Sequence, residues 1–379
     1  MSRRLKIAVV QPSPDMGGAE TFMLALIQNF QKSGHKVFVA SNKSDFFQCA
    51  KKVSGHTFLL PFILDIAGNL RGLVKTLIIA PYAIYFYFRL LKKFKKERVD
   101  LILMSNFTEK LLVTWLSRFV DIPVVWIEYG PVSTQLRLNF GIPGLMYKLA
   151  VKNVNHIIVP SDNTRDNLVK KAHIPRSKII KTPCGVTIPR IKVNRKVGKQ
   201  IVVGVVSRLT REKGIDDVIE AVHIARTKNS NIVLRVVGRG PDMEHFKSRA
   251  RELGVEDSVI FTGYVKDTAE EYAKFDIFAF ATVWELEGFG LCAVEAMSHA
   301  VPVVAYDTGP VSEVLSGGGA VLVSSGRSKK LAKAILRLSR SQKLRHKMGS
   351  VGRRTVLSKY DIRSVAHAYL GVFYKATLV

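Results

Sequence analysis

Short apolar runs alternate with longer segments of helical periodicity along almost the entire chain of 379 residues. The first half has such runs at residues 7–10, 37–40, 101–103, 124–127 and 156–159. The second half has them at residues 201–206, 232–237, 259–261, 277–280, 303–305 and 320–323. Short, mostly apolar strands separated by helices are typical of parallel sheets that helices cover on both faces. The pattern therefore predicts an α/β protein with doubly wound parallel sheets.

A polar, basic stretch at residues 189–200 interrupts this alternation, which restarts directly after it. The chain length also favours two or three domains. We therefore expect two Rossmann-like domains, residues 1–190 and residues 191–379. Helical periodicity in the last part covers residues 328–345 and 362–374. Two positions are open for the last helix, one on the second domain and one packed back on the first.

The net charge of the chain is extreme, at +28. Residues 1–190 hold 28 Lys and Arg against 11 Asp and Glu, a net +17, whereas residues 191–379 hold 30 against 19, a net +11. Nucleic acid, an anionic membrane face and anionic substrates all fit such an excess, and charge does not choose among them. Three widely spaced cysteines indicate neither a zinc site nor a disulfide framework, which favours a reducing compartment.

The N-terminus leads directly into a strand, and its apolar run is too short for a signal peptide, so we expect a cytoplasmic protein. Residues 73–91 complicate this picture because they are apolar and aromatic, with a basic run at residues 92–98 behind them. A buried helix and an interfacial helix both fit. A transmembrane span fits less well, since Lys75 and Pro81 interrupt a run that needs about 20 apolar residues. As an interfacial helix, the segment would dock the first half reversibly on the inner membrane face.

Four turns at the carboxyl ends of predicted strands are candidate ligand sites, because open parallel sheets bind ligands at that edge. The first is Gly17-Gly18, between a strand and a helix, where backbone amides can hold an anion. The second carries Arg208 and Lys213, after the first strand of the second half. A fork-shaped donor beside a compact cation suits a diphosphate, although a solvated basic loop is the plain alternative.

The third turn carries Gly238 and Gly240, but Met243 stands where a dinucleotide fingerprint has its third glycine, so the support for NAD is weak. The fourth turn carries Glu287, which precedes a predicted helix, and Glu295 lies in the second turn of that helix. The residues Gly288, Phe289, Gly290 and Leu291 lie between the two glutamates. Glycines let the backbone approach a ligand closely, and carboxylates accept hydrogen bonds from sugar or ribose hydroxyls. Two surface glutamates on a helix are the plain alternative.

Several motifs are missing from the sequence. It contains no Gly-x-x-x-x-Gly-Lys-Ser/Thr loop, no Asp-x-Asp pair and no Gly-x-Ser-x-Gly elbow, and its nine histidines form no metal-like cluster. The sequence therefore predicts neither a P-loop nucleotide site nor a metal site, and no cofactor.

In this order and spacing, the motifs resemble the retaining GT-B glycosyltransferases of the group 1 family (GT4). The resemblance spans nearly the whole chain and implies two Rossmann-like domains facing across a cleft. It implies that Arg208 and Lys213 hold the donor diphosphate, that Glu287 contacts the transferred sugar, and that Glu295 binds the ribose hydroxyls. It also implies that the glycine-containing turns line the donor site: Gly17, Gly18, Gly238, Gly240, Gly288, Phe289, Gly290 and Leu291.

The sequence departs from the family pattern after the strand at 124–127, where family members commonly carry a His. Glu128 or Tyr129 takes that place and is the candidate on the acceptor side. Thr187 also stands where an Asp is usual near the hinge.

The activity implied by the resemblance is that of a metal-independent, retaining hexosyltransferase. It would move a sugar from a nucleoside-diphosphate sugar to a glycan or lipid-linked acceptor, in cell-surface polysaccharide or glycolipid synthesis. An anionic membrane surface is an expected partner, and nucleic acid is not. Two alternatives stay open. One is a basic membrane- or nucleic-acid-binding protein with a decayed GT-B site, and the other is a GT-B epimerase or phosphorylase.

Overall fold

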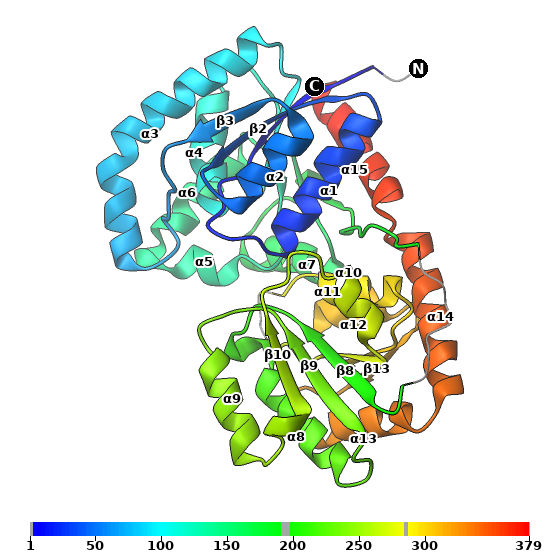
Figure 1. Cartoon of the computed structure of the whole chain (residues 1–379). Coiled ribbons are helices and arrows are strands. Elements are labelled where there is room, and N and C mark those ends of the chain that lie inside the picture. The colour runs from blue at the N-terminus through cyan, green and yellow to red at the C-terminus, as the bar shows by residue number, and fades with distance from the viewer. Residues whose placement is uncertain (1–2, 191–197, 284–286, 379) are drawn as a thin grey trace. The chain divides into compact units, whose positions relative to one another are not determined.

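The chain folds into two compact units, each built around one parallel sheet (Figure 1). The structure is a computed structural model that describes residues 3–190, 198–283 and 287–378, so the middle of the predicted linker lies outside the described residues. Unit 1 comprises Met1–Cys184 and Ile362–Val379, and unit 2 comprises Gly185–Asp361. The predicted class, two α/β domains with parallel sheets, is confirmed. The structure groups the last helix with unit 1.

Unit 1 has a seven-stranded sheet in the order β3-β2-β1-β4-β5-β6-β7, with all described pairs parallel. Its strands are β1 (Lys6–Val10), β2 (Lys36–Asn42), β3 (Thr57–Leu60), β4 (Leu101–Met104), β5 (Val124–Ile127), β6 (His156–Val159) and β7 (Ile179–Lys181). The sequence pattern missed β3 and β7. Both lie at the edges of the sheet and are only partly buried, so neither needs a continuous apolar run.

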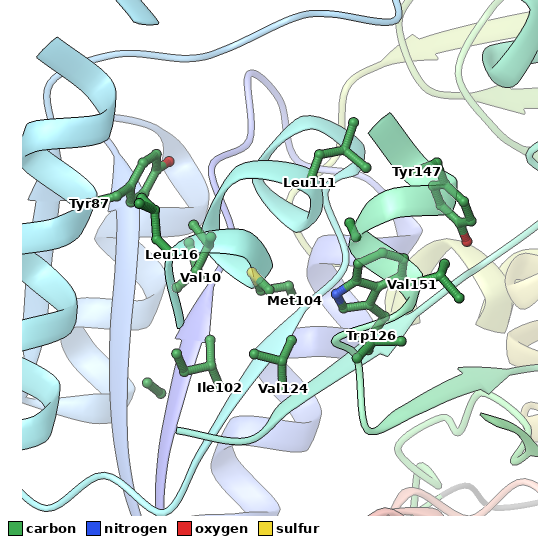
Figure 2. Close-up of a cluster of buried hydrophobic side chains, with 14 of the residues drawn as sticks. Val10, Tyr87, Ile102, Met104, Leu111, Leu116, Val124, Trp126, Tyr147 and Val151 are labelled. Carbon is green, nitrogen blue, oxygen red and sulfur yellow. The ribbon is translucent and has the colours of Figure 1, made fainter. Parts of the chain in front are cut away.

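The helices of unit 1 cover both faces of this sheet. They are α1 (Gly18–Lys32), α2 (Asp45–Ser54), α3 (Leu70–Lys96), α4 (Phe107–Ser117), α5 (Ser133–Arg137), α6 (Ile142–Val151), α7 (Asp162–Lys171) and α15 (Ile362–Thr377), with short 3₁₀ turns η1 (Asn139–Gly141) and η2 (Arg176–Lys178). The last helix packs on α1, where the rings of Phe30 and Phe373 lie 5.4 Å apart between centroids. Figure 2 shows part of the core, in which Trp126 lies against Tyr147.

Helix α3 has 27 residues and continues through Pro81. The side chain of Asn69 caps its first turn by accepting a hydrogen bond from the amide of Gly72 at 2.8 Å. By length and composition it passes as a candidate membrane span, the one such helix among the described residues, although core helices and signal sequences meet the same criterion. Only 28% of its most apolar window is buried, so it is not the fully buried core helix that the sequence left open.

Unit 2 has a six-stranded parallel sheet in the order β10-β9-β8-β11-β12-β13. The strands are β8 (Ile201–Val206), β9 (Ile232–Val237), β10 (Val259–Gly263), β11 (Ile277–Phe280), β12 (Val303–Tyr306) and β13 (Ala320–Val323). The helices are α8 (Ile215–Arg226), α9 (Met243–Glu252), α10 (Ala269–Lys274), α11 (Leu291–Ser298), α12 (Gly309–Leu315), α13 (Ser328–Ser339) and α14 (Gln342–Lys359), with 3₁₀ turns η3 (Arg211–Lys213) and η4 (Glu256–Ser258).

The helix predicted over residues 328–345 is wrong, because the structure has two helices there. The side chain of Ser341 caps α14 by accepting a hydrogen bond from the amide of Leu344 at 3.2 Å. The guanidinium of Arg345 reaches back to the carbonyls of Leu338 and Ser339 at the end of α13. These side-chain contacts satisfy backbone groups that one continuous helix would have paired internally.

A buried ion pair joins three elements of unit 1. The Lys110 ammonium on α4 lies 2.8 Å from a carboxylate oxygen of Glu128, and the two side chains are 1% and 6% exposed. The Tyr147 hydroxyl on α6 donates to the same oxygen at 2.9 Å, and Lys110 also donates to the carbonyl of Ile127 at 2.6 Å. Burial lowers the pKa of Lys110, and the nearby carboxylate opposes that shift.

Removing the lysine should therefore leave a buried charge without its counter-ion. We expect Lys110→Met to lower the free energy of unfolding of unit 1 by about 3–5 kcal/mol. Adding Glu128→Gln should recover part of that loss, because the amide still accepts from Tyr147 and carries no charge. Chemical denaturation measures both effects. A loss below about 1 kcal/mol in the single variant would mean that Glu128 is neutral or hydrated.

Candidate active site

Three turns at the carboxyl edge of the unit 2 sheet are joined by backbone hydrogen bonds. They follow β8, β9 and β11, which are neighbours in the sheet. The amide of Leu209 donates to the carbonyl of Arg239 at 3.0 Å, and the amide of Val283 donates to the carbonyl of Glu212 at 2.9 Å. The turn that carries Arg208 and Lys213 is therefore fixed on both sides.

Glycines allow these turns to pack this closely. A β-carbon at Gly238, where φ is +136°, would lie 1.9 Å from the carbonyl oxygen of Ser207. One at Gly240 would lie 2.2 Å from the carbonyl oxygen of Leu209, and one at Gly214, where φ is +67°, would lie 1.9 Å from that of Ala281. The two predicted donor-binding glycines thus have a packing reason for being glycine, since no side chain fits between the turns.

Lys213 and Glu287 are in direct contact. The lysine ammonium lies 2.9 Å from Oε2 of the glutamate, and the side chains are 14% and 18% exposed. Oε1 of Glu287 accepts a hydrogen bond from the amide of Gly290 at 3.0 Å, at the N-terminus of α11. The carboxylate therefore connects the cation to a helix N-terminus, and both of these groups also suit an anionic ligand.

Glu295 lies in α11, the helix that follows Glu287, and is partly buried. The hydroxyl of Tyr272 donates to its Oε2 at 2.8 Å and approaches the carbonyl of Cys292 at 3.1 Å. Burial raises the pKa of Glu295 to about 7, and the tyrosine hydrogen bond opposes the shift.

Three charged residues of the site act on the thiol of Cys292, in α11. Burial is the main reason why the pKa of its thiol is raised. The carboxylates of Glu287 and Glu295 raise it further, and the ammonium of Lys213 lowers it. Both glutamates and the lysine therefore lie close enough to act on one thiol.

The other predicted residues of unit 2 differ in exposure. Arg208 is exposed, in the turn directly after β8. Gly288 and Phe289 are buried, and the ring of Phe289 packs edge-on against Tyr360 at 5.4 Å between centroids. Leu291 is partly buried and begins α11. The side chain of Phe289 thus anchors the turn in the core. The groups of this turn that remain for binding a ligand are its backbone amides and the carboxylates of the two glutamates.

In unit 1, Gly17 and Gly18 are exposed at the start of α1. The amide of Gly17 donates to Oε2 of Glu20 at 3.0 Å, and the hydroxyl of Ser13 donates to Oε1 of the same residue at 2.9 Å. The glutamate therefore already uses one amide that the sequence assigned to an anion.

The two acceptor-side candidates lie inside unit 1. The carboxylate of Glu128 is held by Lys110 and Tyr147, as described above. The hydroxyl of Tyr129 is buried, its ring lies edge-on to Phe22 at 6.2 Å, and burial raises its pKa well above the ordinary value. Neither residue presents a polar group at the surface of the unit.

The sequence did not point to one polar contact beside the donor turn. Nε2 of His245, on α9, lies 2.7 Å from a carboxylate oxygen of Asp216, and its Nδ1 lies 3.2 Å from the guanidinium of Arg211. The contact links α9, α8 and η3. His245 lies 29 residues after Asp216 in the chain and forms no motif with it, so only the packing of the two helices reveals the contact.

The fold is that of a GT-B protein. HepE from Anabaena, solved with UDP and glucose, superposes with a TM-score of 0.80 at 18% identity, covering 98% of this chain and 100% of HepE. Sucrose-phosphate synthase from Thermosynechococcus elongatus has a TM-score of 0.72 at 18% identity, covering 98% of each chain. At such identities the likeness shows the fold alone.

Two family profiles together span most of the sequence. The profile of Glycosyltransferase Family 4 matches residues 16–190, and that of Glycosyl transferases group 1 matches residues 188–355. The chain belongs to this family of group 1 glycosyltransferases.

Two relatives of known name align with most or part of the chain. The alpha-monoglucosyldiacylglycerol synthase of Streptococcus pneumoniae is 26% identical over 335 residues, which are 80% of this chain and 71% of that protein. A GDP-mannose-dependent alpha-(1-6)-phosphatidylinositol monomannoside mannosyltransferase of Mycobacterium tuberculosis is 31% identical over 173 residues, or 44% of this chain and 45% of that protein. The match thus spans less than half the length of the second relative.

If Arg208 and Lys213 hold a diphosphate, each alanine variant should lower turnover about a hundredfold or more, because one lost electrostatic donor costs about 2.7–4 kcal/mol in the transition state. Lys228→Ala is the control, since it removes an exposed cation of unit 2 that lies outside the donor turn. Steady-state kinetics on folded protein provides the measurement. Full turnover in both Arg208→Ala and Lys213→Ala would contradict the assignment.

Proposed function

We propose that the chain is a metal-independent, retaining hexosyltransferase that uses a nucleoside-diphosphate sugar. The acceptor is a glycan or a lipid-linked sugar, in cell-surface polysaccharide or glycolipid synthesis. The contact of Lys213 with Glu287 beside Glu295 carries the proposal, because it brings a cation and two carboxylates to the ligand edge of the sheet. Membership of the family and the names of the relatives, which act on diacylglycerol and phosphatidylinositol glycolipids, support it.

The proposed chemistry follows from charge. Breaking a sugar–phosphate bond builds negative charge on the leaving diphosphate and positive character on the anomeric carbon. Arg208 and Lys213 stabilise the diphosphate, which can replace a metal ion. Lys213 would exchange Glu287 for the diphosphate, and the released carboxylate would accept hydrogen bonds from the transferred sugar. Retention requires the acceptor to attack from the leaving-group side, and we assign no covalent nucleophile.

The location that we propose is the cytoplasmic face of a membrane, with unit 1 docked reversibly. The net +17 of residues 1–190 and the lysines at the end of α3 support this, because each basic residue near an anionic surface adds about 1 kcal/mol before screening. The acceptor would then be membrane-linked.

A basic binding protein with a decayed site is the second candidate, favoured by the net charge of +28 and the missing acceptor-side His. The Lys213–Glu287 contact counts against it. An epimerase or phosphorylase would keep the same donor site. Since an epimerase needs no acceptor, the dependence of turnover on acceptor separates it from a transferase.

The two glutamates should affect different ligands. Glu295→Gln should weaken both the free nucleoside diphosphate and the sugar nucleotide, whereas Glu287→Gln should mainly weaken the sugar nucleotide. Because burial raises the pKa of Glu295 to about 7, its carboxylate is charged only as pH rises through 7. Binding of the nucleoside diphosphate should thus strengthen from about pH 6 to about pH 8 in the parent and stay flat in Glu295→Gln. Calorimetry tests this, and equal losses for both ligands in both variants would count against the assigned roles.

Turnover should survive excess EDTA, because the basic diphosphate site supplies the charge that a metal would otherwise supply. Sugar release or transfer is measured before and after chelation, with Mg²⁺ or Mn²⁺ added back. Complete loss with EDTA, restored by either ion, would show that the charge-stabilisation argument is wrong.

A further inference from the structure

Helix α3 has two apolar faces, and one of them is exposed. One stripe packs into the core of unit 1 through residues such as Leu73, Ala83 and Tyr87. A second stripe faces outward, with Val74, Ile78 and Tyr82 exposed by 48%, 74% and 53%. A helix with apolar residues on all sides is normally buried on all sides. The outer stripe of α3 is therefore an apolar surface that would be more stable in contact with other apolar groups than with water.

The exposed stripe continues onto a second segment of unit 1. Phe140, in η1, is 92% exposed, and Leu145, in α6, is 63% exposed. The side chain of Asn139 donates to the carbonyls of Ile66 and Gly68, at 2.8 and 3.3 Å, just before α3 begins. This contact places η1, which contains Phe140, beside the loop that leads into α3. We call the exposed residues Leu70, Val74, Ile78, Tyr82, Phe140 and Leu145 the apolar edge surface.

The apolar edge surface has basic neighbours and no acidic ones in its own segments. Residues 66–96 and residues 133–151 contain no Asp or Glu. Arg71, Lys75, Arg137 and Lys148 are exposed around the surface, and a second group of lysines follows at the C-terminal end of α3. Asp65 is exposed just before α3, beside Gly68 and Gly72, so the surround is mainly basic with one acidic residue. An apolar surface with a mainly basic surround complements the acyl boundary and anionic headgroups of a bilayer.

The charge also argues against other occupants. A second copy meeting this surface in a two-fold contact would bring like charges together around it. A transmembrane path would require α3 to give up its packing in the core, where Tyr87, Leu91 and Phe94 are buried. A bilayer surface satisfies both the apolar residues and their basic surround while α3 stays in place.

The apolar edge surface lies at the ligand edge of the unit 1 sheet. Helix α3 follows the end of β3, and η1 follows the end of β5 through α5. In a parallel sheet those ends share one edge with the end of β1, where Gly17 and Gly18 lie. We propose that the apolar edge surface inserts into the headgroup boundary of an anionic bilayer and so turns the ligand edge of unit 1 toward the membrane. This deepens the proposed function, on which it rests for the membrane-linked acceptor.

The test is flotation of the full chain with vesicles of phosphatidylcholine alone or mixed equally with phosphatidylglycerol. We expect binding only to the mixed vesicles, weakening as salt rises. Ile78→Glu and Phe140→Glu should each lower the bound fraction about tenfold or more. Leu357→Glu is the matched control, because Leu357 is 44% exposed on α14 of unit 2 and should bind as the parent does.

Two charge-neutralised variants locate the contact. Replacing Arg71, Lys75, Arg137 and Lys148 with Gln should weaken binding more than replacing Lys92, Lys93, Lys95 and Lys96, which lie further from the apolar edge surface along α3. Parent-like binding by both glutamate variants, or a larger effect of the second lysine group, would overturn the proposed surface. A parent chain that stays unbound at low salt would overturn membrane docking itself.

Calorimetric binding of UDP and GDP to each variant keeps the two proposals apart. Nucleotide binding that is unchanged while vesicle binding is lost supports the surface. A parent chain that binds neither UDP nor GDP would instead count against the proposed function. A dimer in solution that Phe140→Glu dissociates would assign the surface to a second copy and overturn the proposal.

Discussion

The parallel alignment of the strands is the constraint on which the candidate site depends. Parallel strands bring their carboxyl ends to one edge, so every strand-to-helix turn that can face a ligand gathers there. In unit 2 the turns after β8, β9 and β11 are also joined by backbone hydrogen bonds. Gly238 and Gly240 make this spacing possible because a β-carbon at either position would overlap the neighbouring turn. The exposed Arg208 thus stands on a rigid support.

Electrostatic balance within the site limits the kind of ligand that suits it. Lys213 is opposed by Glu287, which also accepts from the N-terminus of α11, and burial holds the pKa of Glu295 near 7. A diphosphate would compete with the Glu287 carboxylate for Lys213. Hydroxyl groups of a ligand would meet the carboxyl group of Glu295, which ionises in the neutral range. Both exchanges favour a ligand that supplies anionic and hydroxyl groups together, as a sugar nucleotide does.

Unit 1 combines a conventional core with an unusual surface. Its core includes a buried lysine–glutamate ion pair, whereas α3 leaves seven large apolar side chains exposed. Burial of one stripe fixes the position of α3, and the same helix thereby exposes the other. Because the surrounding residues are mainly basic, the exposed stripe suits a boundary where apolar and anionic groups lie side by side.

The sequence by itself determined the central strands, because residues such as 124–127 and 277–280 are buried on both faces and must be continuously apolar. It also determined the order of the candidate turns along the chain, since each follows such a strand. The edge strands β3 and β7, and the break between α13 and α14, have no such pattern. Only the tertiary structure decided that Glu128 faces Lys110, that Tyr272 faces Glu295, and that Asn139 meets the loop before α3. Such contacts depend on which strands become neighbours in a sheet. The strand order brings together residues that are far apart in the chain, and no local sequence pattern records that order.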